Sequence, residues 1–152
     1  MNSNLIIFLA LHIIFGTLAI ILLTAYLLSI SKKDPSLKSL KLNSFVSFLS
    51  IIISWISGGY YYTTYYGKSV KPLILKGELS WIHSIIMETK EHIFLFLPFL
   101  TLTIFGITYL LKDKLEKDKN FRFATAVLCF TTVSIILAIL IGGIVISGAV
   151  KK

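Results

Sequence analysis

LIIFLALHIIFGTLAIILLTAYLLSI, residues 5–30, contains no Asp, Glu, Lys or Arg and a single histidine, His12. A helix that crosses a bilayer needs about 20 mostly apolar residues. The run is too long for a cleaved signal peptide, and too poor in positive charge at its start. It therefore predicts a retained transmembrane helix.

Three further runs repeat this composition: residues 42–62, 93–111 and 123–150. The third is preceded by residues 80–92, in which apolar residues recur at helical spacing and no Gly or Pro intervenes, so we expect one helix over 80–111. Short connections at 31–41 and 112–122 favour antiparallel neighbours. The sequence thus predicts one all-α domain, residues 1–152, built as an integral membrane four-helix bundle with up-down topology. Pro98 is expected to kink the third helix.

The net charge of +8 lies in loops between apolar runs. This distribution is typical of membrane flanks and favours lipid head groups over nucleic acid as the counterpart. The two short connections carry nine Lys and Arg residues and the other side carries six. The positive-inside bias predicts a plasma-membrane protein with cytoplasmic short loops and both termini outside. The run of tyrosines at 60–66 is typical of an aromatic belt at the interface.

Two histidines stand out because ionisable residues inside membrane spans are rare and are functional-site candidates. His12 is expected about 10 Å below the outer end of the first helix, and His92 at the outer mouth of the third. Glycines fall in the same outer half, where small residues allow close approach of a helix or room for a flat cofactor. They are Gly16, Gly58, Gly142 and Gly143.

Two neutral imidazoles on facing helices suit a six-coordinate haem iron. We therefore expect a small b-type cytochrome that holds one haem between His12 and His92, beside the four glycines. No C-x-x-C-H motif is present, so this haem b would be bound non-covalently. The plan resembles that of four-helix membrane b-type cytochromes. Their paired histidines on successive helices are absent, which puts two-haem conduction in doubt. A quinone or a partner redox protein would exchange the electrons.

Two other hypotheses remain open at this level. A non-haem site for copper, iron or zinc would use His12, His92, Glu88 and His83, because mixed imidazole and carboxylate ligands suit those ions. Glu88 lies one turn before His92 and is the expected partner of its ring. Alternatively, the chain is a non-catalytic subunit of a larger membrane assembly or a homo-oligomer, in which the histidines bridge helices and the glycines are contacts.

Overall fold

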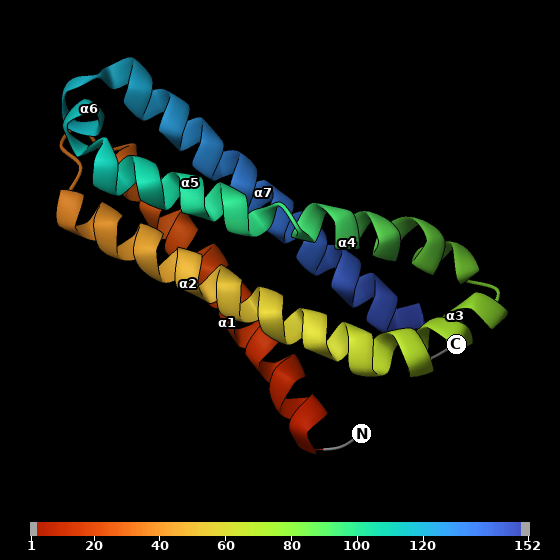
Figure 1. The fold of residues 1–152 in the computed structure, drawn as a ribbon. Coiled ribbons are helices and arrows are strands. Elements are labelled where there is room, and N and C mark those ends of the chain that lie inside the picture. Colours follow the sequence, from red (N-terminus) through yellow and green to blue (C-terminus); the bar gives the residue numbers. More distant parts are fainter. Residues whose placement is uncertain (1–2, 150–152) are drawn as a thin grey trace.

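The computed structural model describes residues 3–149, all of whose regular elements are helical (Figure 1). In chain order these are α1 (Ser3–Ile30), α2 (Leu37–Tyr61), η1 (Tyr62–Val70), α3 (Lys71–Lys76), η2 (Ile82–Met87), α4 (Glu88–Phe94), α5 (Leu97–Leu110), α6 (Lys112–Lys117) and α7 (Lys119–Ala149). The elements η1 and η2 are π-helices.

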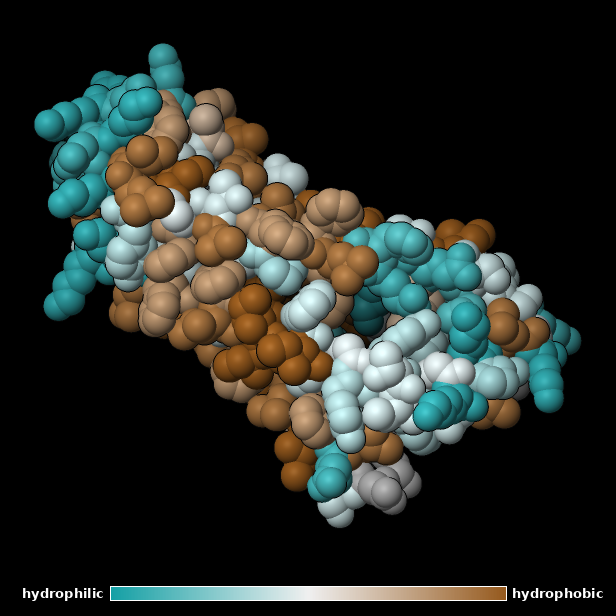
Figure 2. Space-filling model, in the orientation of Figure 1, coloured by the Kyte–Doolittle hydropathy of each residue, from teal (hydrophilic) through white to brown (hydrophobic). Residues whose placement is uncertain are grey.

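Four helices within residues 3–149 are long and apolar enough to cross a membrane. Their bounds are Ser3–Ile30, Leu37–Lys76, Ile82–Leu110 and Lys119–Ala149. Figure 2 shows a broad hydrophobic belt between hydrophilic ends, the arrangement that a bilayer requires. The prediction of an all-helical chain with four apolar helices is confirmed.

The second helix extends well beyond the predicted end at Tyr62. It continues through η1 and α3 to Lys76, so most of residues 63–79, which the sequence leaves as a connection between the predicted helices 42–62 and 80–111, is helical. Pro72 does not break it because it lies in the first turn of α3, where a missing N–H and a fixed φ are tolerated. The chain leaves the helix only at Gly77, whose extended backbone has φ −89° and ψ 172°.

The third helix is interrupted before Pro98. α4 ends at Phe94, a tight turn follows with Phe96 N–H donating to the carbonyl of Ile93, and α5 begins at Leu97. This agrees with the predicted kink, because proline cannot donate to the preceding turn. The break lies near the middle of the molecule, where α4 leaves the line of α5 (Figure 1).

A row of buried serines on α2 faces α1, its most extensive neighbour. Ser47, Ser50 and Ser57 each donate a hydrogen bond to the carbonyl four residues earlier, at 2.6–2.7 Å. Their hydroxyls are thereby satisfied inside the helix, and their small size allows the two helices to approach closely. Ser54 is the exception, because its hydroxyl reaches across to α1.

Tyr26 joins α1 to α5 in the main core. Its hydroxyl lies 2.8 Å from Thr108 Oγ1, and both side chains are fully buried. We expect Tyr26→Phe to lower the unfolding temperature in detergent, by the equivalent of about 0.6 and at most about 1.7 kcal/mol, as for polar contacts between membrane helices. Tyr109→Phe, at an exposed ring one residue further on, is the control. Equal unfolding temperatures for the two variants would show that this hydrogen bond adds no stability.

Candidate functional site

A cavity of about 1420 Å³ lies in the half of the molecule away from the loop at Ser31–Ser36, a half named here the distal half. α1, α2, η1, α4, α5 and α7 all contribute to its wall. Figure 2 shows a hollow in this half, between hydrophilic side chains of α4 and the pale Gly- and Tyr-rich part of the second helix. Most small-molecule pockets measure about 300–1,000 Å³. The cavity is therefore large enough for a cofactor and a second molecule.

Five of the predicted site residues line this cavity. They are His12, Gly16, Gly58, His92 and Gly143. Gly142 faces a separate pocket of about 270 Å³ with Ile86, and neither pocket is lined by Glu88 or His83.

The ring of His12 is held by Ser54 of α2. His12 Nδ1 lies 2.9 Å from the carbonyl oxygen of Ser54 and 3.0 Å from its hydroxyl, and that hydroxyl donates in turn to the carbonyl of His12 at 3.0 Å. A carbonyl can only accept, so the proton resides on Nδ1. In the neutral ring Nε2 then carries the free lone pair.

Gly58 provides the space in which His12 lies. A Cβ on Gly58 would come within 2.5 Å of His12 Nδ1, whereas one on the adjacent Gly59 would meet nothing within 4 Å. A Cβ on Gly16, one turn after His12, would lie 3.3 Å from Ser54 Oγ. The absence of a side chain at these two glycines therefore leaves space for the His12–Ser54 pair. The sequence pattern alone did not distinguish this role from that of leaving space for a cofactor.

His92 is exposed and also has its Nδ1 engaged. The atom lies 2.7 Å from the backbone carbonyl of Glu88, so it donates to that oxygen and leaves Nε2 as the acceptor. Glu88 is thus the partner of His92, as its position one turn earlier predicts, although through its backbone rather than its carboxylate.

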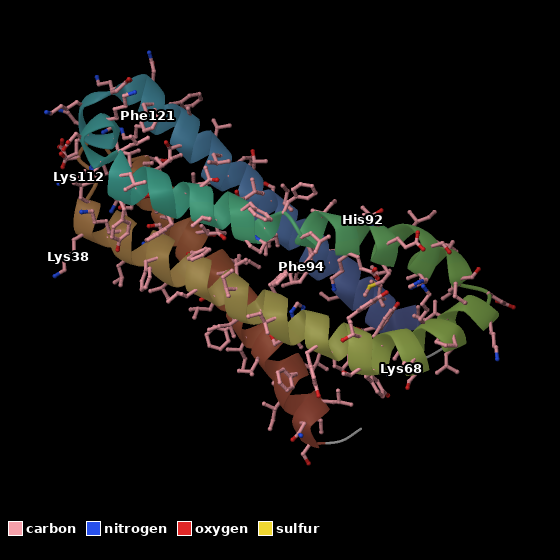
Figure 3. All side chains as sticks on the ribbon, viewed as in Figure 1. Lys38, Lys68, His92, Phe94, Lys112 and Phe121 are labelled. Atoms are coloured by element: carbon pink, nitrogen blue, oxygen red, sulfur yellow. The ribbon has the colours of Figure 1, made fainter. Side chains whose placement is uncertain are left out.

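Phe94 is the residue of α4 that touches His12. The two rings meet edge to face with centroids 5.7 Å apart. Phe94 and His92 are two residues apart on one helix, so their side chains leave it about 200° apart. His92 therefore leaves α4 on the side opposite Phe94 (Figure 3), although it is among the residues that line the cavity.

His83 belongs to a second core rather than to the cavity. The residue is 1% exposed and its Nδ1 lies 3.0 Å from the hydroxyl of Tyr66. Its Nε2 is buried without a hydrogen-bond partner among the described residues. Tyr66 and Met87, in η1 and η2, form this core with neighbouring apolar side chains. Sequence reasoning missed the pairing because it treated the segment after Tyr62 as a loop.

Lys90 and Glu91 also line the cavity, although their spacing in the sequence is typical of a solvated helix turn. Glu91 Oε1 is buried and has no hydrogen-bond partner within residues 3–149. The Nζ of Lys90 reaches α7 and lies 3.2 Å from where a Cβ on Gly143 would be.

No group of three or more His, Cys, Asp or Glu side chains within residues 3–149 is arranged to hold a metal ion. Cys129 is fully buried in the main core, with Sγ 3.4 Å from the carbonyl of Leu23.

No family model, no curated protein and no solved structure matches the chain. Function must therefore be argued from the cavity and its side chains.

Proposed function

We propose that the chain is a small membrane b-type cytochrome that holds one non-covalent haem in the distal cavity, where His12 and His92 would bind the iron. The haem would supply reversible one-electron chemistry. The chain supplies the two imidazoles, an apolar wall and separation from water.

The observation that carries this proposal is the shared state of the two rings. Both histidines line one cavity, and both give their Nδ1 proton to a backbone carbonyl. Histidines that ligate metals almost always donate their other N–H in this way, which fixes the tautomer and raises ligand basicity. His12 and His92 therefore carry the free Nε2 lone pairs that an iron requires.

The character of the cavity wall also supports a porphyrin. Ile20, Ile51, Leu97 and Ile136 line its deeper end together with His12. An apolar wall suits a macrocycle and influences the redox potential of its iron. Phe94, whose ring packs against His12, is the side chain that a haem would displace.

The setting completes the proposal. Apolar helices of this length would insert in the plasma membrane as an up-down bundle, with the short basic loops in the cytoplasm and the distal half outside. Electrons would pass to or from a quinone or a partner redox protein, and the chain would work alone, as a homo-oligomer or beside other membrane subunits.

The optical spectrum of the purified protein tests the proposal. After expression with added haem precursor, we expect a Soret band and a sharp alpha band on reduction, at about one haem per chain. A colourless preparation with stoichiometric copper, iron or zinc would replace the proposal with a non-haem site. A colourless, metal-free chain that co-purifies with other membrane proteins would indicate a non-catalytic subunit.

A further inference from the structure

The end of the cavity nearest η1 and η2 differs chemically from the end near Ile20. It is lined by Tyr62, Tyr66, Lys90 and Glu91, a set that combines aromatic rings, a cation and a carboxyl group. Both π-helices border it, and π-helical turns occur frequently at functional sites. A haem held by His12 does not account for these groups.

Glu91 provides the most specific signal. Its Oε1 is buried on the cavity wall and receives no hydrogen bond from the described part of the chain, although the hydroxyl of Tyr62 lies close to the same carboxyl group. Buried polar atoms in proteins are nearly always partnered, so each exception calls for an explanation. A ligand with a hydroxyl group could donate the missing hydrogen bond to this oxygen.

The neighbouring side chains indicate what else such a ligand carries. The rings of Tyr62 and Tyr66 stack with centroids 5.3 Å apart, and the bond from Tyr66 to His83 fixes this aromatic wall. An aromatic wall favours a flat ring against it. Lys90 lines the same end and offers ammonium donors to oxygen atoms on that ring.

The rim of the cavity indicates how the ligand enters. Ile56, Leu95 and Ile144 line it and are 57%, 51% and 65% exposed. Large exposed aliphatic side chains on a membrane helix face acyl chains, so the cavity is open to a molecule dissolved in the bilayer. The ligand is therefore lipid-soluble and carries a hydroxylated ring.

We propose that this end of the cavity binds a quinol, with a ring hydroxyl donating to Glu91 Oε1, the ring against Tyr62, and Lys90 donating to a ring oxygen. This assignment rests on the proposed function in that the quinol would be the electron partner. Binding itself needs no haem, because none of these residues is a haem ligand.

Binding of a fluorescent alkyl-hydroxyquinoline N-oxide, a quinol analogue, tests the site by quenching in detergent-solubilised protein. Glu91→Leu removes the acceptor at similar size, and Glu91→Gln keeps a weaker, uncharged one. Hydrogen bonds that involve a charged group contribute more than neutral ones, so we expect Glu91→Leu to weaken binding about tenfold to hundredfold and Glu91→Gln to weaken it less. Glu88→Leu is the matched control, because Glu88 lies in the same helix outside the cavity wall and should bind as wild type does.

Wild-type protein that does not quench the analogue, or Glu91→Leu protein that binds it as tightly as wild type, would overturn the assignment. So would an equal loss in Glu88→Leu. Elution volume and unfolding temperature verify that each variant is folded. If Glu91→Leu does not fold, Glu91→Gln provides the test in its place. The haem content of the wild-type protein separates the two proposals. If wild-type protein holds no haem and analogue binding still depends on Glu91, only the cytochrome proposal fails; if it holds haem and Glu91 is irrelevant to binding, only the quinol site fails.

Discussion

Replacing Gly58 with alanine is expected to dislodge His12 and to lower the stability of the bundle. The new methyl group would lie 2.5 Å from His12 Nδ1 and 2.9 Å from its Cε1, closer than atoms in contact can approach. The ring must move, and with it the hydrogen bond to the Ser54 carbonyl is lost. Overpacking of this kind costs about 1–3 kcal/mol. Thermal unfolding in detergent measures the loss, and haem content measures its effect on the site.

Gly59→Ala is the matched control because a Cβ there meets nothing within 4 Å. Alanine is the better helix former by about 0.5–1 kcal/mol, so this variant should be as stable as wild type or slightly more stable. The paired comparison removes the helix propensity of alanine, which both variants share. Similar unfolding temperatures for the two variants would contradict the claim that Gly58 provides the space occupied by the His12 ring.

Loss of haem from His12→Ala is the second large effect that we expect. His12 is the histidine that the structure holds most firmly, with three contacts to Ser54 and an edge-to-face contact to Phe94. Without its Nε2 the site keeps at most one axial ligand, and that ligand lies on an exposed side chain. We expect His12→Ala to lose most of its Soret absorbance. His92→Ala should retain some haem, with a change from low-spin to high-spin absorption.

His83→Ala is the control for this series. Its ring lies in the core beside Tyr66, outside the cavity wall, so the variant should keep the wild-type haem content even if its unfolding temperature falls. Haem loss that is equal in all three histidine variants would indicate general destabilisation. A His12→Ala protein with a full Soret band would remove His12 as a ligand.

The fold was largely predictable because length and hydrophobicity decide which segments form apolar helices. Pro98 marked the break in the third helix because ring geometry acts locally. Pro72 and Gly67 did not end the second helix, however, since Pro72 lies in the first turn of α3 and the π-helix η1 passes through Gly67. A proline or glycine in the sequence therefore ends a helix only where the chain cannot remain helical past it.

The site was predictable only in part because a sequence gives the position of a residue along a helix but not its neighbour on another helix. His12 and His92 were identifiable as rare polar groups, and they do line one cavity. The partner of His12, the backbone of Ser54, carries no sequence signal because every residue has a carbonyl. The burial of Glu91 Oε1 was hidden for a similar reason, since it depends on neighbours from other helices.

The electron paramagnetic resonance spectrum of the oxidised, haem-loaded protein tests the central claim most directly, since it reports on the axial ligands. With Nε2 of both His12 and His92 free to bind iron, we expect a low-spin ferric signal typical of two imidazoles, converted to high-spin by His92→Ala. A wild-type spectrum without a haem signal, or a low-spin signal unchanged in both His12→Ala and His92→Ala, would contradict the account.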